Sequence, residues 1–290
     1  MKSTKPKAPV MIPVDNLAPF DGHPYKVMDD DSMNELTESV QDSGILEPLT
    51  VRPLEDSDNY EIISGHRRYH AAQKAGLTQV PAFIRAVGRD EAAILLVDSN
   101  LHRERILPSE KAFAYKLKAE ALNHQGRRDF TSGQLVPNSD DNRTTAQIGE
   151  QTGESYKTVQ RYIRLTNLIP ELLDMMDEGK IAFSVGVELS FLDDQLQYDV
   201  LNACEENDNT PSYAQAVRMH KAYGTGELTK NDIDAIMCEE KANQREKLTI
   251  PMEKLRGKIP GGYNAQQQQD YVLKACDFYH RHLIRQRDAR

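Results

Sequence analysis

The sequence predicts an α+β protein in which a small α/β domain is followed by helical segments. Strand-like alternating stretches at 49–53 and 60–64 lie between helical stretches in the N-terminal third of the chain. From Pro108 onward the predicted elements are helices separated by glycine or capping residues. At 290 residues the chain is long enough for two small domains, each with its own core.

The N-terminal domain is predicted over residues 1–106 and alternates between strands and helices. Ser32-x-x-Glu35 is a capping box, which opens a helix expected to end before Gly44. A second helix is expected from Arg67 to Gly76 and a third over 90–99. The predicted strands lie at 11–14, 49–53, 60–64 and 80–87.

The helical domain is predicted over 107–240, and its first helix is expected to begin at Pro108. Proline is favoured there because the N–H groups of the first helical turn have no partner within the helix, so the missing N–H costs nothing. This helix is expected to reach about Asn123 and to end at Gly126. The polar stretch 127–142 is predicted to be a mobile connector, with DNA contact through Arg127 and Arg128 as the alternative. Later helices are expected at 170–178, from 184 or 185, from 210–211 to 223, and from 229.

A helix-turn-helix is predicted over about 144–166. Thr144-x-x-Gln147 resembles a capping box, Gly153-Glu154 forms the turn, and Ser155 starts a second helix that runs to Leu165. Gln and Arg can pair with base edges, while Lys and Ser suit phosphates. An ordinary helical hairpin with a solvated face is the alternative. The expected core residues are Ala146, Ile148, Val159 and Ile163, and the candidate DNA contacts are Ser155, Tyr156, Lys157, Gln160, Arg161 and Arg164.

A linker and a C-terminal segment are predicted over 241–290. The charged stretch 239–247 is interpreted as a linker or an extended helix, and 248–252 is a weak strand candidate. Helical spacing over 265–290 places Val272, Cys276, Tyr279 and Leu283 on one apolar stripe. Either dimerisation or docking on the same chain would bury this stripe.

The net charge of −9 is distributed unevenly, which keeps DNA binding possible. Basic residues dominate between 103 and 128 and between 143 and 166, whereas the acids gather at 29–31, 193–194 and 205–208. No apolar run is long enough to span a membrane, and the prolines at 6, 9 and 13 argue against a secretion signal or an amphipathic membrane anchor. Three widely spaced cysteines favour a reducing cytoplasm over a disulfide framework or a zinc site: Cys204, Cys238 and Cys276.

The most informative motif lies where the strand at 60–64 gives way to the next helix. Ser64-Gly65 allows close backbone approach, the helix N-terminus presents free amides, and Arg67 and Arg68 can fork onto phosphate oxygens. This combination favours a polyphosphate ligand. A solvated loop is the alternative for such a short motif.

Three stretches together resemble the ParB family of DNA-partition proteins: 44–48, 65–71 and 99–103. They correspond to the family's glycine-isoleucine-x-x-proline segment, its Gly-Glu-Arg-Arg-x-Arg-Ala box and its Glu-Asn-x-x-Arg box. The resemblance extends through the helix-turn-helix to about residue 240. It implies a sulfiredoxin-like nucleotide domain that binds CTP, a DNA reader, and a C-terminal domain that dimerises and touches DNA without sequence preference.

The resemblance also implies which residues hold the nucleotide. Gly44, Ile45, Pro48 and Thr50 are expected near the base. The triphosphate is expected in a cradle made by Ser64, Gly65, His66, Arg67 and Arg68. Asn100 and Arg103 complete the phosphate and metal side, with Asn100 as a Mg²⁺ ligand.

Two departures from the family pattern bear on turnover. His66 replaces the glutamate of the arginine box, and Ser99 replaces the glutamate that assists metal binding and hydrolysis. Asp98 could substitute only if the backbone shifted. CTP binding is therefore expected, and slow CTP hydrolysis is left open.

The mechanism that the resemblance implies is a clamp. A homodimer loads on an inverted-repeat DNA site, CTP closes it around the duplex, and a ParA-type ATPase is the expected motor. The protein is expected in the cytoplasm on the nucleoid, with a chromosome, plasmid or mobile element as cargo. Three alternatives stay open: a transcription regulator, a nucleoid-occlusion factor, and a phosphotransfer enzyme on the same nucleotide-binding fold.

Overall fold

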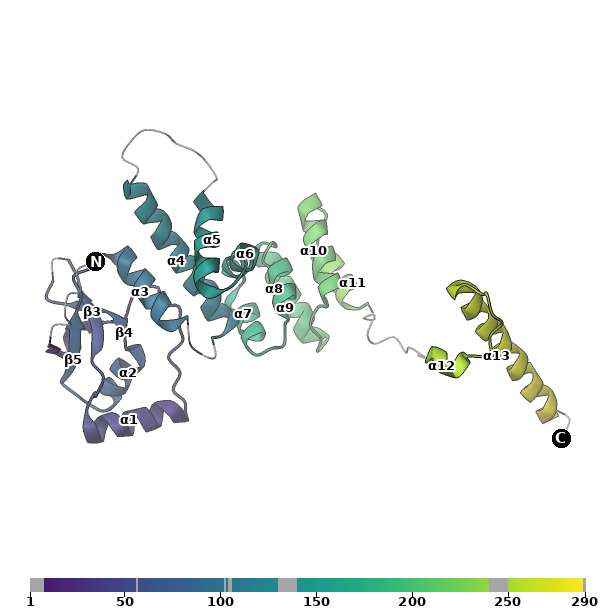
Figure 1. Ribbon diagram of the computed structural model, residues 1–290, viewed down its shortest axis with the longest axis horizontal. Helices are drawn as coiled ribbons and strands as arrows, with labels where there is room; N and C mark the ends of the chain where they lie inside the picture. The colour runs from purple at the N-terminus through teal and green to yellow at the C-terminus, as the bar shows by residue number, and fades with distance from the viewer. Residues whose placement is uncertain are drawn as a thin grey trace. The chain divides into compact units, whose positions relative to one another are not determined.

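The computed structural model describes residues 8–55, 57–101, 103, 106–129, 140–239 and 250–288. The chain forms two compact units, Met1–Glu239 and Glu240–Arg290. The first unit contains a sheet and most of the helices (Figure 1). In the part of the chain that the structure describes, no helix is long and apolar enough to cross a lipid bilayer.

A five-stranded mixed sheet has the strand order β1-β5-β3-β4-β2. β3 pairs antiparallel with β4, where Val51 lies opposite Ile62, and parallel with β5, where Leu49 lies opposite Ala82. β1 extends the sheet beside β5, and the two-residue β2 extends it beside β4. The strands are β1 Val10–Pro13, β2 Leu17–Ala18, β3 Leu49–Pro53, β4 Tyr60–Ser64 and β5 Gln79–Ile84.

The central strands were predicted with the bounds that the structure gives, and the outer strands were not. β3 and β4 are confirmed at both ends. β1 lies one residue earlier than expected, and β5 ends at Ile84 rather than residue 87. β2 was missed because two residues are too few to show alternation.

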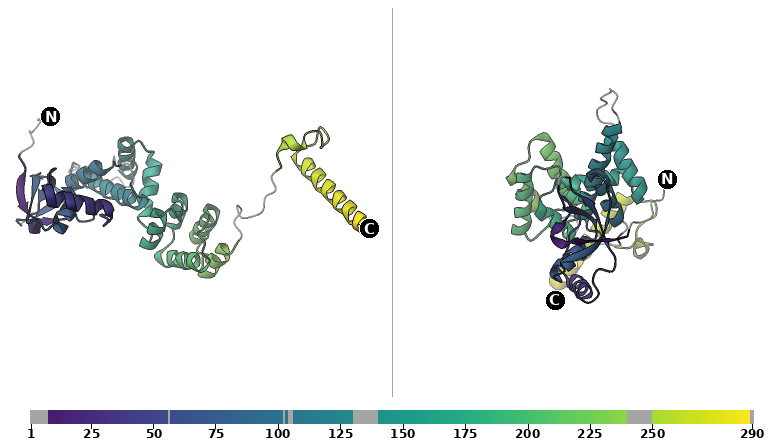
Figure 2. Two further views of the ribbon diagram at one scale, coloured as in Figure 1. Left: turned by 90° about the horizontal axis from the view of Figure 1, so that it is seen from below. Right: turned by 90° about the vertical axis from the view of Figure 1, so that its left-hand side faces the viewer.

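Helices cover both faces of the sheet: α1 (Asp31–Ser43), α2 (His66–Lys74) and α3 (Arg89–Asn100). Consecutive strand residues point to opposite faces, and Ile62 and Ile63 of β4 are both buried. Ile62 lies in the core with α1 and α2, whereas Ile63 lies in the core with α3. α3 lies between the sheet and α4 (Pro108–Asp129), as Figures 1 and 2 show.

The first helix begins on a different cap from the one predicted. The Asp30 carboxylate accepts a hydrogen bond from the N–H of Met33 at 2.9 Å, so Asp30 and not Ser32 is the N-cap. The end of α1 is confirmed: it stops at Ser43, and Gly44 follows with a φ of 70°. The helix predicted over 90–99 is α3, one residue longer at each end.

Eight helices, α4 to α11, complete the described part of the first unit. α4 continues past Gly126 to Asp129, so its predicted end was wrong. The helix packs against α3 and α5, and this packing outweighs the ~1 kcal/mol by which a glycine destabilises a helix. The predicted connector at 127–142 is thus partly helical, and residues 130–139 lie outside the described part. The later helices are α5 Asp140–Thr152, α6 Tyr156–Leu165, α7 Pro170–Asp177, α8 Phe183–Leu189, α9 Asp194–Glu206, α10 Tyr213–Thr225 and α11 Lys230–Met237.

Two predicted helix starts were also wrong. Thr144 lies inside α5, where it is buried and its hydroxyl donates to Asn123 Oδ1 at 2.6 Å. α10 begins after a capping box of Ser212 and Gln215, not at Thr210-Pro211. The capping box at Thr229 is confirmed as the start of α11, and α9 was not predicted.

The second unit contains α12 (Met252–Leu255) and α13 (Ala265–Asp288). The helix predicted from residue 265 is confirmed. The strand candidate at 248–252 is wrong where it is described, because Met252 starts α12; residues 240–249 lie outside the described part. Within its unit, α13 exposes Leu273, Phe278, Tyr279, Leu283 and Ile284.

Candidate functional site

The turn between β4 and α2 has the geometry that the sequence predicted. Gly65 is the N-cap of α2 in the left-handed region, with φ 105° and ψ 22°. A Cβ at this position would lie only 3.0 Å from Leu49 Cγ. The backbone therefore approaches β3 closely, and the first amides of α2 have no acceptor within the helix. No acidic side chain occupies the first turn of α2, which leaves its N-terminus suited to an anion.

A cavity of about 310 Å³ opens at this turn. It lies within the size range of small-molecule sites, ~300–1,000 Å³. Two of the three resemblance motifs contribute to it, together with the segment 23–27, which the sequence analysis missed. The lining residues are His23, Tyr25, Lys26, Val27, Ser64, Gly65, His66, Arg67, Arg68, Ser99, Asn100 and Arg103.

The two arginines at the start of α2 have different surroundings. Arg67 Nη2 donates to Ser32 Oγ at 2.5 Å and lies 4.0 Å from Asp30 Oδ1. Arg68 donates to the carbonyl oxygens of Glu47 and Pro48, the latter at 3.1 Å. Arg67 is therefore held by exposed groups that a ligand can replace, whereas Arg68 also fixes the 44–48 segment to α2.

The four residues expected near the base do not line this cavity. Gly44 ends α1, and Ile45 packs partly buried against the core of the sheet. Pro48 lies beside the cavity through its bond with Arg68, and Thr50 lies opposite Ser64 in the β3–β4 ladder. Of the eleven residues expected around one ligand, seven line this cavity and these four do not, although Arg68 and Ser64 of the lining contact Pro48 and Thr50. That these residues bind a nucleotide stays a prediction.

A pair of uncharged imidazoles is part of the cavity lining. The rings of His23 and His66 have centroids 3.7 Å apart. His66 Nε2 accepts from the N–H of Phe20 at 3.3 Å, and His23 Nδ1 donates to the carbonyl of Tyr25 at 2.8 Å. Burial, followed by the charges of His23 and Arg103, lowers the pKa of His66 to about 3, and burial lowers the pKa of His23. Both rings are therefore uncharged near neutral pH.

The predicted metal ligand, Asn100, also lines the cavity. Asn100 is buried, and both of its described hydrogen bonds use the amide nitrogen, which donates to Leu96 O at 2.8 Å and to Ser99 Oγ at 3.3 Å. Its amide oxygen fits a hard cation that is shared with ligand phosphates. The described residues contain no cluster of three His, Cys, Asp or Glu side chains that would hold a metal without such a ligand.

Asp98 cannot take the place of the missing glutamate. Its carboxylate accepts from the ammonium group of Lys118, which also donates to Gln151 Oε1 at 2.5 Å. Lys118 is fully buried between α3, α4 and α5. Asp98 therefore faces the helices, and Ser99 is the residue that lines the cavity.

The segment 23–27 connects the cavity to the helices. The N–H of Lys26 donates to Glu110 Oε1 at 2.8 Å, and its ammonium lies 2.8 Å from Asp174 and 3.2 Å from Asp177. Hydrogen bonding with Asp174, against a small effect of burial, raises the pKa of Lys26. The only sequence signal for this segment is a short run of aromatic and basic residues after Gly22, which has no periodicity.

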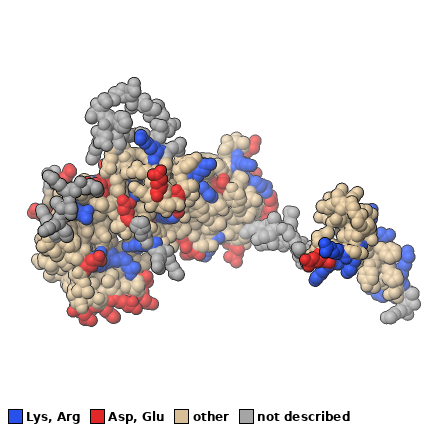
Figure 3. All heavy atoms as spheres, in the orientation of Figure 1, with Lys and Arg blue, Asp and Glu red and all other residues tan. Residues whose placement is uncertain are grey.

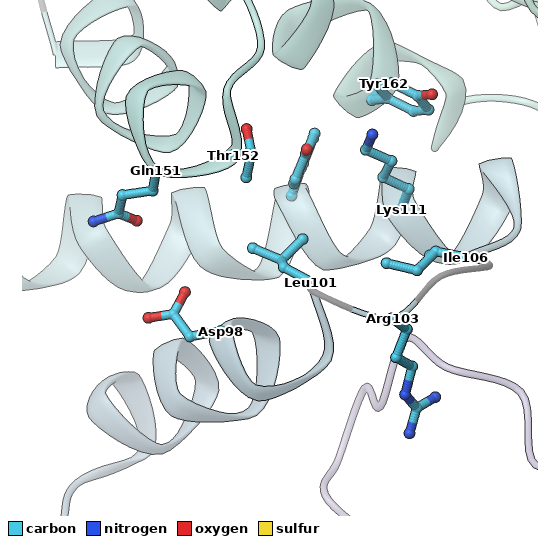
Figure 4. A pocket seen from close by; sticks show the side chains of 9 residues that line it. Asp98, Leu101, Arg103, Ile106, Lys111, Gln151, Thr152 and Tyr162 are labelled. Carbon is cyan, nitrogen blue, oxygen red and sulfur yellow. The ribbon is translucent and has the colours of Figure 1, made fainter.

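A larger cavity of about 580 Å³ lies where α3 meets α4, α5 and α6 (Figure 4). Lys111 pairs with Glu154 there, and its ammonium lies 4.7 Å from the Tyr162 ring centroid. Burial opposes the charge of Lys111, yet the bond to Glu154 raises its pKa. Lys111 is paired in this cavity, which also lacks a glycine turn, so the smaller cavity is the better candidate for a phosphate site. Arg103 lines both cavities.

The helix-turn-helix expected over 144–166 is present as α5 and α6. Ser155 caps α6 by accepting from the N–H of Thr158 at 3.1 Å, and Glu154 N–H donates to Gly149 O across the turn. Ile148 and Val159 are buried as predicted, whereas Ala146 and Ile163 are only partly buried.

The outward face of α6 contains the candidate DNA contacts. Tyr156, Lys157 and Arg161 are exposed, and Gln160 and Arg164 are half-buried. Two arginines lie on phenylalanine rings: Arg161 at 4.9 Å from the Phe183 centroid and Arg164 at 3.9 Å from that of Phe191.

In Figure 3, acidic side chains gather over α1, and basic side chains lie over α2.

Comparisons with known proteins agree with the motifs. The ParB N-terminal domain model matches residues 2–101. The chromosome-partitioning protein Spo0J of Thermus thermophilus is 31% identical over 209 residues, which are 72% of this chain and 70% of that protein. A nucleoid occlusion protein of Lysinibacillus sphaericus is 29% identical over 200 residues, 69% of this chain and 60% of that protein. The C-terminally truncated ParB of Caulobacter crescentus, solved with the centromeric parS site, is 20% identical with a TM-score of 0.40, covering 79% of this chain and 98% of that chain.

The fold is a mixed-sheet domain with an arginine-bearing glycine turn, joined to a helix-turn-helix. The chain belongs to the ParB family of chromosome-partitioning proteins.

Proposed function

We propose that this protein binds CTP at the β4–α2 turn and duplex DNA through α5 and α6, and that the nucleotide controls how it holds DNA. One observation carries the nucleotide half of the proposal. Gly65, the first amides of α2, Arg67 and Arg68 converge on the cavity that Asn100 and Arg103 also line. Amides, a side-chain-free turn and two guanidiniums are the groups that bind phosphate chains in proteins.

The residues present fit a nucleoside triphosphate with Mg²⁺. Arg67 and Arg68 would bind the phosphates, Gly65 would allow close approach of the backbone, and the Asn100 oxygen would ligate the cation. The cation would neutralise phosphate charge. Since Ser99 provides no carboxylate, we infer binding with little turnover.

The proposed assembly follows from DNA symmetry. An inverted-repeat site is matched by a two-fold symmetric dimer, so each protomer would place one α6 in a major groove. CTP would then close the nucleotide domains around the duplex, and a ParA-type ATPase would act on the complex. We place the protein in the cytoplasm, on the nucleoid.

Equilibrium binding of labelled CTP at millimolar Mg²⁺ tests the nucleotide half. The wild-type chain is expected to bind saturably, and Arg67→Ala with Arg68→Ala is expected to abolish binding. Arg218→Ala, which removes an exposed arginine paired with Glu239, is the matched control and should bind like wild type. DNA retention that is the same for wild type and the double variant, with and without CTP, would refute the proposal.

Nucleoid occlusion is a second candidate, favoured by the similarity to the Lysinibacillus sphaericus protein. Chromatin immunoprecipitation separates the two. A single broad domain around one site indicates partition, many dispersed domains indicate occlusion, and sharp peaks at promoters indicate a transcription regulator.

A further inference from the structure

A third cavity, of about 380 Å³, lies beside the outward face of α6. Its walls come from α4, α5, α6 and the turn that follows α6. None of the residues that line it is acidic, and most carry hydrogen-bonding groups: Lys116, Thr145, Gln160, Ile163, Arg164, Thr166 and Asn167.

The two cations of this cavity have no carboxylate partner in the part of the chain that the structure describes. Lys116 and Arg164 form no ion pair with any carboxylate among the described residues, in a chain whose net charge is −9. By contrast, Lys111 and Lys118, which precede and follow Lys116 on α4, are paired with Glu154 and Asp98. Two unpaired cations at one polar cavity make a site for an anion.

Arg164 is fixed in place before any ligand arrives. Its guanidinium carbon lies 3.9 Å from the Phe191 centroid, and the His220 ring stacks on Phe191 at 3.9 Å with an interplanar angle of 12°. Both centres are too close to Phe191 to share one face, so Phe191 lies between them. Glu188 Oε2 lies 2.6 Å from His220 Nδ1 and holds the outer ring.

The fixed guanidinium retains unused hydrogen-bonding capacity. Arg164 Nε is buried and has no hydrogen-bond partner among the described residues. A buried donor without an acceptor costs free energy, so the unpaired Nε is an unusual feature that the fold of the described residues does not explain. A preorganised arginine also loses little side-chain entropy on binding.

We propose that this cavity binds a backbone phosphate of duplex DNA, with Lys116 and Arg164 as its charged ligands and Phe191 as the residue that positions Arg164. The assignment rests on the proposed DNA-binding function. A phosphate is favoured because Arg164 shares α6 with the candidate base contacts, and phosphate contacts beside a recognition helix fix its register in the groove. Lys116 extends the DNA surface onto α4, outside the helix-turn-helix.

The test uses the full chain and two duplexes, one selected by the protein from a random pool and one with that sequence scrambled. Lys116→Gln is expected to weaken both complexes by similar factors. It should also reduce the slope of log affinity against log salt by about 0.9, the value for one phosphate contact. Between 50 and 200 mM salt the variant would then lose about threefold less affinity than wild type. Lys180→Gln, an exposed lysine paired with Glu178, is the matched control with an unchanged slope.

Phe191→Leu tests the positioning role, because it keeps an apolar side chain and all charges. It is expected to weaken both complexes while the salt slope stays at the wild-type value, and Phe191→Tyr, which keeps the aromatic ring, is expected to bind like wild type. An unchanged slope in Lys116→Gln, or a loss confined to the selected duplex, would overturn the phosphate assignment. If wild type binds neither duplex, the proposed DNA-binding function fails together with this one.

Discussion

The imidazole rings of His23 and His66 lie in contact in the lining of the proposed phosphate cavity, with their centroids 3.7 Å apart and their planes tilted by 38°. The family pattern has a glutamate at the position of His66. An uncharged ring there removes a negative charge from the neighbourhood of Arg67 and Arg68, which makes the cavity more favourable for an anion.

This pair makes stability depend on pH. The pKa of His66 is about 3 in the folded protein, against 6.5 ordinarily. Between these values the unfolded chain binds a proton that the folded chain does not, so the free energy of unfolding rises with pH in this window, by up to about 1.4 kcal/mol per pH unit. His66→Gln should flatten this rise, because glutamine does not titrate. Urea denaturation at pH 4 to 7 measures it; equal pH slopes for variant and wild type would contradict the buried neutral ring.

Gly65 is expected to tolerate no side chain. Gly65→Ala combines a left-handed backbone with a Cβ 3.0 Å from Leu49 Cγ, so we expect it to destabilise the protein by about 2–3 kcal/mol and to abolish CTP binding. Gly76→Ala is the matched control, because Gly76 has a φ of 71° and open space around it. Its cost should be about 1 kcal/mol, with CTP affinity retained. Thermal unfolding and CTP binding of both variants decide the point, and equal costs would refute the close approach.

The ion pair of the buried Lys118 with the partly exposed Asp98 should stabilise the junction of α3, α4 and α5. Asp98→Asn leaves the ammonium with only neutral partners, and we expect a loss of about 2 kcal/mol, below the range for fully buried pairs because Asp98 is 47% exposed. Lys118→Met should cost less, since it removes the charge and keeps the volume. Chemical denaturation ranks the two variants; the reverse order would contradict this account.

Ser99 is expected to limit CTP turnover. Ser99→Glu places a carboxylate at the cavity, next to Asn100, and is expected to raise the rate of CTP hydrolysis by about tenfold or more. Ser99→Gln, of similar size and without the charge, is the control and should hydrolyse no faster than wild type. Phosphate release under saturating CTP and Mg²⁺ gives the rates. A wild-type rate that Ser99→Glu does not increase would place the limitation elsewhere.

Only part of the proposed nucleotide cavity could be predicted from the sequence. The turn at Gly65 was predictable, because a strand, a glycine and a helix start are all local patterns. The contribution of 23–27 was not, since this segment reaches the cavity through contacts with Glu110, Asp174 and Asp177, which lie 84 to 151 residues away. The sequence allowed Asp98 to substitute for the glutamate only with a backbone shift, and its bond with the buried Lys118, 20 residues away, could not be predicted from a local pattern.

The amino-acid order by itself determined the central strands, the α2 turn, most helix starts and the presence of a second helix at Ser155, because hydrophobic period and capping act over a few residues. Only the tertiary structure decided which lysines of α4 have a carboxylate partner. Lys111 and Lys118 are paired with Glu154 and Asp98, whereas Lys116 has no such partner among the described residues. The physical reason is that each ion pair depends on which helix, distant in sequence, packs against that face of α4, and this packing cannot be predicted from a local pattern.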